Sequence, residues 1–159
     1  MNYYDQHVHS SFSFDSQTEL SDYLKHADGC FVTTEHVDLE NSANHFMDSW
    51  MDYDRYSLYL ENLQKNTDIR LLKGVEIGWL RKHHGRLMAW LQCKQFDIIL
   101  LSIHQNGIFD YMDEEAKKHD IIYILRSYFQ QMLDALRSGI PANVLSHFDY
   151  VRRIQDVDT

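Results

Sequence analysis

Two histidines one residue apart, His7 and His9, close a short strand-like run at residues 3–9. On a β-strand, residues i and i+2 point to the same side, so both imidazoles can reach one point beyond the end of the strand. Neutral imidazole is the commonest metal ligand among side chains. Asp5, two residues earlier, could orient one of the rings. Because histidines at strand ends are common, this pair becomes evidence for a metal site only if later strands end in the same way.

The later predicted strands do end in similar residues. Apolar runs indicate four further strands, at residues 30–34, 70–78, 96–104 and 142–147. At or next to their carboxyl ends stand His36, Glu76, His104 and His147. An α/β barrel gathers its active site at the carboxyl ends of its parallel strands. Since chance would rarely place His or Glu at five successive strand ends, the register predicts a site for several metal ions.

Helical periodicity separates these strands. Residues 18–29 are expected to form a helix that Thr18 caps and Gly29 ends. Apolar residues at helical spacing predict further helices at residues 53–63, 87–91 and 113–138. The acidic residues 37–52 are expected to form a loop before the helix at residues 53–63. This alternation, without linkers or repeats, predicts one α/β domain over residues 1–159 with a mostly parallel sheet.

The composition limits the class of protein. The 159 residues suffice for one domain but are few for an α/β barrel, which needs about 250. The formal net charge is -9 and no basic stripe is present, so stable binding to nucleic acid is not expected. Neither a signal peptide nor an apolar run of roughly 18 residues is present, so no membrane association is expected. Cys30 and Cys93 have no CxxC partner, which predicts buried thiols in a cytoplasmic protein.

The predicted ligands favour particular metals and a particular chemistry. Imidazoles with carboxylates suit zinc, iron or manganese better than magnesium or calcium. Two or three such ions close together lower the pKa of a shared water and stabilise charge on a phosphoryl group. The expected reaction is therefore hydrolysis of a phosphate ester, with Glu76 and His104 at the reacting centre.

Five short motifs carry a resemblance to a known family. They are Asp5-x-His7-x-His9, Thr34-Glu35-His36, Gly74-Val75-Glu76-Ile77-Gly78, Ser102-Ile103-His104 and Ser146-His147-Phe148-Asp149. In this order they resemble the motifs of the polymerase-and-histidinol-phosphatase (PHP) superfamily, over essentially the whole chain. The segments Ser13-Phe14-Asp15-Ser16 and Thr33-Thr34-Glu35-His36 narrow the resemblance to the histidinol-phosphatases of Gram-positive bacteria.

This resemblance implies a distorted (β/α)7 barrel, similar to a TIM barrel, that holds three metals. The implied ligands are His7, His9 and Glu76 for the first metal, Glu76 as a bridge with His104 and His147 for the second, and Asp15 and His36 for the third. Asp15 departs from the many relatives that have histidine at its position. A carboxylate there is acceptable for iron or zinc.

One family motif has no counterpart in this chain. The family takes the remaining ligands of the first and third metals from a late Asp-x-His motif, and nothing after His147 matches it. The chain is therefore expected to hold about the first five of seven barrel units. An open barrel would expose the edge of its fifth strand, so self-association through that edge is also expected.

Two pairs of residues have alternative interpretations. Arg152 and Arg153 follow His147 closely, and one of them could bind a substrate phosphate through two hydrogen bonds, or both could be solvated. His83 and His84 lie in the chain's basic cluster, which could neutralise phosphate. For the histidine pair, a structural role is the favoured interpretation.

The expected function is metal-dependent hydrolysis of a small phosphate monoester. The resemblance narrows the substrate to L-histidinol phosphate, an intermediate of histidine biosynthesis. Two alternatives stay open: another PHP phosphoesterase that acts on a nucleotide or a phosphotyrosine, and a remnant that binds metal without turnover. A phosphatase assay beside a full-length relative would separate them.

Overall fold

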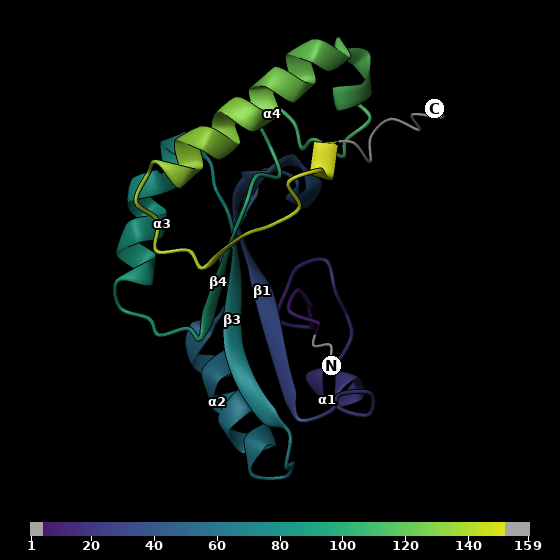
Figure 1. The fold of residues 1–159 in the computed structure, drawn as a ribbon, viewed down its shortest axis with the longest axis vertical. Helices are drawn as coiled ribbons and strands as arrows, with labels where there is room; N and C mark the ends of the chain where they lie inside the picture. Colours follow the sequence, from purple (N-terminus) through teal and green to yellow (C-terminus); the bar gives the residue numbers. More distant parts are fainter. Residues whose placement is uncertain (1–4, 152–159) are drawn as a thin grey trace.

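A five-stranded sheet forms the centre of the molecule (Figure 1). The computed structural model describes residues 5–151. The strands are β1 (Cys30–Asn41), β2 (Met47–Ser49), β3 (Arg70–Gly78), β4 (Ile98–Ser102) and β5 (Val144–Leu145). They lie in the order β2-β1-β3-β4-β5, with β2 antiparallel to β1 and the other pairs parallel. The predicted α/β class with a mostly parallel sheet is confirmed.

The strands alternate with helices along the chain. These are α1 (Leu20–Tyr23), α2 (Tyr53–Gln64), α3 (His84–Leu91) and α4 (Ile121–Leu136), with short 3-10 turns η1 (Ser42–Asn44), η2 (Arg81–His83) and η3 (Ala116–Lys118). In Figure 1, α3 and α4 lie on the β4 side of the sheet, and the N-terminal segment lies on the far side of β1. Among residues 5–151, no helix combines the length and the apolar character that crossing a membrane requires.

The three central strands alternate between an apolar and a polar face. Their register pairs His36 with Glu76, and Glu76 with Leu100. Because side chains alternate along a strand, residues that are two apart share a face. The apolar face carries the fully buried residues Val37, Val75 and Ile77, and the nearly buried Leu39 and Leu101. The opposite face carries His36, Asp38, Glu76 and Ser102, so the sheet presents these polar side chains together.

The predicted first strand, at residues 3–9, is wrong for the part that the structure describes. Residues 5–10 are not in a strand, and residues 3 and 4 lie outside the described residues. Val8 nevertheless lies beside β1: Thr34 N–H donates to the Val8 carbonyl (2.8 Å), and Val8 N–H donates to Thr34 Oγ1 (3.2 Å). A side-chain hydroxyl here takes the place of a backbone carbonyl. The segment therefore stays beside β1 without forming a regular ladder.

The boundary predicted at His36 is also wrong. β1 continues past His36 to Asn41 because Val37 and Leu39 enter the core, so the predicted loop at residues 37–52 begins as a strand. Within the same predicted loop, β2 pairs with the end of β1: Asp38 lies opposite Ser49, and Asn41 opposite Met47.

Other predicted elements are shorter than expected. The helix predicted at residues 18–29 is reduced to α1, whose capping position is Glu19 rather than Thr18. The long helix begins only at Ile121, because the side chain of Asp120 accepts a hydrogen bond from Tyr123 N–H (3.1 Å) and caps it. The strands predicted at 96–104 and 142–147 shorten to β4 and β5.

Both cysteines are free thiols, as predicted, but they are not buried. Cys30 is half-buried at the start of β1, and Cys93 is exposed in the turn after α3. Leu91, two residues earlier, is buried in the core, but the turn after α3 leaves Cys93 on the surface.

Candidate metal centre

Glu76, near the end of β3, is the centre of a cluster of imidazoles, and its side chain is fully buried. Around its oxygen Oε2 lie His7 Nε2 at 3.1 Å, His9 Nε2 at 3.3 Å and His36 Nδ1 at 3.2 Å. Around Oε1 lie His104 Nε2 at 3.2 Å and His147 Nε2 at 3.0 Å. Imidazoles from the N-terminal segment, β1 and the segments after β4 and β5 therefore meet on one carboxylate.

The local backbone directs these side chains toward Glu76. Ser102, at the end of β4, donates a hydrogen bond to Glu76 Oε1 (2.5 Å) and fixes that oxygen beside His104. His147 has a φ of 25°, in the left-handed region that favours glycine. Its carbonyl accepts a hydrogen bond from Tyr128 of α4 (2.5 Å), which holds the strained turn after β5. Strained backbone of this kind is often found at functional sites.

Asp15 lies at the open side of the cluster, where its Oδ2 is 3.3 Å from His36 Nε2. The loop that carries Asp15 is held by the fully buried Glu35. Glu35 accepts hydrogen bonds from the hydroxyls of Ser10 (2.7 Å) and Ser13 (2.6 Å). Glu35 thus positions a loop next to the centre, although its own oxygens point away from the histidines.

Three groups of side chains have donor atoms within 4.8 Å of one another: His7, His9 and Glu76; His9, Asp15 and His36; and His36, Glu76 and His104. The first group is the set expected for the first metal. In the second, His9 joins Asp15 and His36. In the third, His36 stands in the place expected for His147, although His147 also contacts Glu76. The seven predicted ligands therefore lie in one cluster.

The imidazoles and carboxylates at the centre shift one another's pKa values. Burial, with the nearby imidazole of His36, lowers the pKa of His9 to about 4. Burial also opposes the charged form of His36, but Asp15 and Asp38 outweigh it and raise its pKa to about 10. Although burial favours the neutral acid, His104 and the other imidazoles hold the pKa of Glu76 well below its usual range. The carboxylates thus remain ionised and attract positive charge.

Several polar atoms at the centre have no aligned hydrogen-bond partner among the described residues, although ring nitrogens lie within 3.3 Å of Glu76 Oε2. They are buried, and they include Glu76 Oε2, His9 Nδ1 and His147 Nδ1. An unpaired buried polar atom is costly unless another group satisfies it. Imidazoles around a carboxylate are the donor set that zinc, iron or manganese prefers. The residues therefore fit a centre of divalent transition metals.

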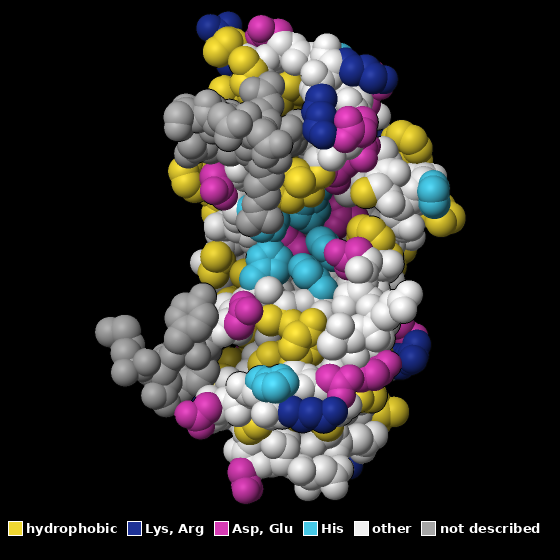
Figure 2. All heavy atoms as spheres, turned by 90° about the vertical axis from the view of Figure 1, so that its right-hand side faces the viewer, with side chains coloured by type: hydrophobic (Ala, Val, Ile, Leu, Met, Phe, Trp, Pro, Cys, Tyr) yellow, Lys and Arg dark blue, Asp and Glu magenta, His cyan; other side chains and the backbone are white. Residues whose placement is uncertain are grey.

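The centre opens into a cavity of about 520 Å³. Besides the predicted ligands, its lining includes Phe14, Asn41, Ala43, Asp110 and Tyr150. Figure 2 shows histidine side chains gathered at the middle of one face, with acidic side chains among them. Asn41 donates to Asp110 Oδ2 (3.0 Å) and Tyr150 donates to Asp110 Oδ1 (3.3 Å), so the side wall of this cavity is internally bonded.

Asp38 is a site residue that sequence reasoning missed. It is fully buried on β1, and its carboxylate contacts both His104 and His36. The rule that singled out His7 and His9 applies here too, because residues i and i+2 of a strand share a face and Asp38 is two residues after His36. Because a loop was expected after His36, the strand periodicity was not extended as far as Asp38.

The predicted basic residues lie elsewhere or are already paired. Arg152 and Arg153 lie outside the described residues. In the basic cluster, Lys82 Nζ forms an ion pair with Glu40 Oε2 (2.5 Å), and Arg86 forms one with Asp48. His83 is nearly buried and His84 accepts a hydrogen bond from Trp79 Nε1 (3.4 Å). This arrangement agrees with a structural role for the cluster.

The chain belongs to the PHP domain family, whose model matches residues 5–158. It is 26% identical over 165 residues to the histidinol-phosphatase of Lactococcus lactis subsp. lactis, covering 94% of this chain and 57% of that protein. It is 25% identical over 158 residues to a probable histidinol-phosphatase of Thermotoga maritima, covering 97% of this chain and 58% of that protein. The resemblance seen in the sequence is therefore confirmed.

The structure agrees with this family membership. It is similar to the crystal structure of histidinol phosphate phosphatase from Lactococcus lactis in complex with zinc, L-histidinol and phosphate. The TM-score is 0.84 at 25% identity, over 94% of this chain and 59% of the other. The predicted fold, of the PHP barrel type, is confirmed for the part that this chain spans. The chain spans less than two thirds of the length of these relatives.

Proposed function

We propose that this chain provides the metal centre of a phosphomonoesterase, and that its substrate is L-histidinol phosphate. One observation carries the proposal: the buried carboxylate of Glu76 has imidazoles against both of its oxygens, contributed by separate segments of the chain. Such a carboxylate is suited to bridge two cations. Membership of the PHP family and similarity to histidinol-phosphatases support the reaction and the substrate.

In this proposal the predicted ligands are shared among three ions. His7, His9 and Glu76 would hold one ion, Glu76, His104 and His147 a second, and His36 with Asp15 a third. When bound, two or three divalent ions would supply positive charge to a phosphate ester and would make water a better nucleophile. Ser102 keeps Glu76 Oε1 in place through its hydrogen bond, and Tyr128 keeps the His147 turn in place.

The cavity supports a small substrate. Its volume of about 520 Å³ lies within the range of small-molecule sites, which is about 300–1,000 Å³. The cavity has polar groups on one wall, Asn41, Asp110 and Tyr150, and an aromatic ring, Phe14, near its mouth. These groups would contact the part of the substrate that is not phosphate. Arg152 or Arg153 remains a proposed phosphate ligand, on the sequence argument alone.

The decisive experiment measures metal and phosphate together. The purified protein is loaded with zinc or manganese, dialysed and analysed for metal. Phosphate release is then measured from L-histidinol phosphate, a nucleoside monophosphate and phosphotyrosine. We expect bound metal and preference for L-histidinol phosphate, with both lost in Glu76→Gln. Bound metal without any phosphate release would contradict the phosphatase proposal, and preference for another ester would contradict the substrate.

A further inference from the structure

We propose that Asp38 is a positioning residue of the metal centre, which holds the Nδ1 side of His104 and His36 so that Nε2 of each ring faces the ions. This inference rests on the proposed metal centre but not on the identity of the substrate. It is carried by the contacts of the Asp38 carboxylate, by the space that Gly78 leaves for it, and by a hydrogen bond from Asn41.

The two nitrogens of His104 face opposite partners. Nδ1 lies 2.9 Å from Asp38 Oδ1 and 3.1 Å from Oδ2, whereas Nε2 lies 3.2 Å from Glu76 Oε1. A ring that donates its Nδ1 proton to a carboxylate presents a bare Nε2, which is the form that binds a metal. Asp38 thus selects the tautomer of His104 that the centre requires.

His36 also places its Nδ1 beside Asp38, but as an ion-pair contact and not as an aligned hydrogen bond. Its Nδ1 lies 3.0 Å from Asp38 Oδ2 and 3.2 Å from Glu76 Oε2, and its Nε2 lies 3.3 Å from Asp15 Oδ2. One carboxylate therefore contacts two rings, one on β1 and one in the segment after β4. Because both oxygens of Asp38 already meet imidazole nitrogens, the geometry assigns it to orientation rather than to direct ligation.

Gly78 makes this position of Asp38 possible. In the register of β1 and β3, Asp38 lies directly opposite Gly78. A Cβ atom at residue 78 would lie 1.9 Å from Asp38 Oδ1 and 2.5 Å from Asp38 Cγ. Any side chain there would push the carboxylate away from both rings. The second glycine of the Gly74–Gly78 motif is thus explained by the space that Asp38 needs.

Asn41 fixes the carboxylate from the other side. Its Nδ2 donates to Asp38 Oδ1 (3.3 Å) and to Asp110 Oδ2 (3.0 Å), and Asn41 is nearly buried. In the described part of the chain, Asp38 has no lysine or arginine partner. A fully buried carboxylate whose charged partners are two ring nitrogens gains its stability from those rings. Its position and theirs therefore depend on one another.

The first measurement uses the unaltered protein. After labelling with ¹⁵N-histidine and loading with zinc, NMR reports which nitrogen of His104 and His36 carries a proton and which binds the metal. We expect protonated Nδ1 and zinc-bound Nε2 for both rings. Zinc on Nδ1 of either ring, or zinc bound directly by Asp38 in a crystal structure of the loaded protein, would overturn the proposal.

The second measurement compares matched substitutions. Asp38→Asn keeps the shape but removes the charge, and we expect zinc affinity to fall by about 10–100-fold, the range seen for groups that orient metal-bound histidines. Gly78→Ala should lower zinc affinity in the same direction by displacing Asp38. The control is Asp97, which lies at the other end of the sheet, where its Oδ2 accepts a hydrogen bond from Lys73 N–H (2.8 Å). Asp97→Asn makes the same chemical change there and should leave zinc affinity unchanged.

These outcomes separate this proposal from the proposed function. Asp38→Asn with unchanged zinc affinity and unchanged ¹⁵N signals would overturn the positioning role, whatever the phosphatase activity. Absence of phosphate release from the unaltered protein would contradict the proposed function and leave the zinc and NMR results of Asp38 intact.

Discussion

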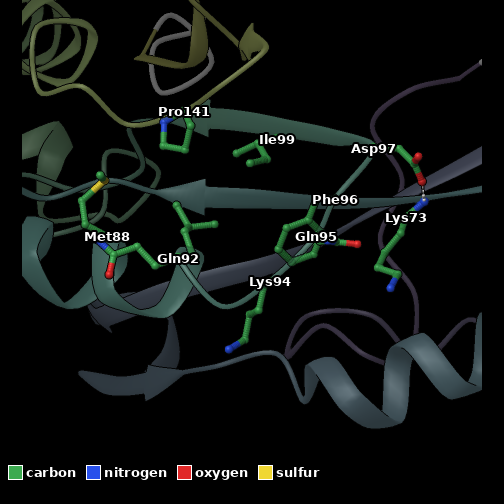
Figure 3. Close-up of a pocket in the computed structure, with 10 residues that line it drawn as sticks. Lys73, Met88, Gln92, Lys94, Gln95, Phe96, Asp97, Ile99 and Pro141 are labelled. Atoms are coloured by element: carbon green, nitrogen blue, oxygen red, sulfur yellow. Dashed lines mark hydrogen bonds between the residues drawn. The ribbon is translucent and has the colours of Figure 1, made fainter.

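The two ends of the sheet carry pockets that differ in chemistry more than in size. At the amino ends of β4 and β5 lies a pocket of about 670 Å³, lined by residues such as Lys73, Gln95, Phe96 and Pro141 (Figure 3). At the carboxyl ends lies the smaller cavity of about 520 Å³ with the histidine cluster. The larger pocket contains no histidine in its lining. Of these two pockets, the larger one lacks the histidine cluster, so pocket size does not identify the candidate metal centre.

The difference lies in how polar groups are satisfied. In the larger pocket, Lys73 Nζ donates to Ser57 (2.8 Å) and Tyr53 (3.3 Å), and Lys94 Nζ lies 4.7 Å from the centre of the Trp90 ring. In the histidine cavity, buried atoms such as Glu76 Oε2 find no hydrogen-bond partner among residues 5–151. Unpaired buried polar atoms therefore distinguish the end whose residues could hold an ion from the other end, where the polar groups of the pocket are already paired.

The largest effect is expected at the carboxyl ends of the strands, where Glu76 lies. Glu76→Gln keeps the shape of the side chain but removes the charge that would offset two cations. We expect metal content to fall at two positions together and phosphate release to fall by more than about 100-fold, beyond the loss typical of an orienting residue. Elemental analysis and a phosphate assay measure both, with Asp97→Asn as the control. Unchanged metal stoichiometry would show that Glu76 is not a bridge.

Zinc should stabilise the folded protein by binding to the histidine cluster. A ligand at 100 times its dissociation constant adds about 2.7 kcal/mol to the free energy of unfolding when it binds only the folded state. Thermal unfolding with zinc and with a chelator measures the shift. Glu76→Gln should lose the shift, and Phe96→Ala should retain it. An equal shift in both variants would mean that zinc binds outside the histidine cluster.

Phe96→Ala should affect stability alone. Phe96 packs edge-on against Tyr53 and beside Trp90, with ring centres 5.3 Å and 5.8 Å apart. Because this ring is only partly buried, its removal should lower the free energy of unfolding by about 1–2 kcal/mol, less than for a fully buried aromatic residue. Chemical denaturation measures the loss. If zinc affinity also fell, the two ends of the sheet would be energetically coupled.

The smallest effect is expected for Lys94→Gln, which removes the charge over the Trp90 ring. A cation–π contact at a partly exposed site contributes about 0.5–1 kcal/mol. Metal content and phosphate release should not change. A clear loss of phosphate release in this variant would give the larger pocket a part in function and remove the contrast between the two ends.

Much of this arrangement follows from the sequence. The strand that leads to His104 is a nearly continuous apolar run, and the one that leads to Glu76 is a shorter apolar pattern interrupted by Lys73 and Gly74; both appear near the predicted positions. α2 was predictable because its apolar stripe is regular. The structure adds the cap, in which the Asp52 side chain accepts a hydrogen bond from Arg55 N–H (3.1 Å). The histidine cluster was predictable because parallel strands present their carboxyl ends together.

The remainder depends on contacts that no local pattern shows. Val8 pairs with Thr34 through a hydroxyl, so a strand-like sequence gives an extended segment instead of a strand. β1 extends beyond His36 because β2 returns to pair with it. The role of Asp38 depends on its position opposite Gly78, a register that only the assembled sheet defines.

Because histidines near both ends of the chain contribute to the centre, the complete centre can form only late in folding. His7 and His147 meet on Glu76 only after the N-terminal segment has docked against β1 and β5 has joined β4. Contacts between residues so distant in sequence form slowly, because the intervening chain must first be ordered. During synthesis the chain therefore exposes only partial sets of these ligands until β5 emerges. A tightly bound ion would then mark the docking of both the N-terminal segment and β5.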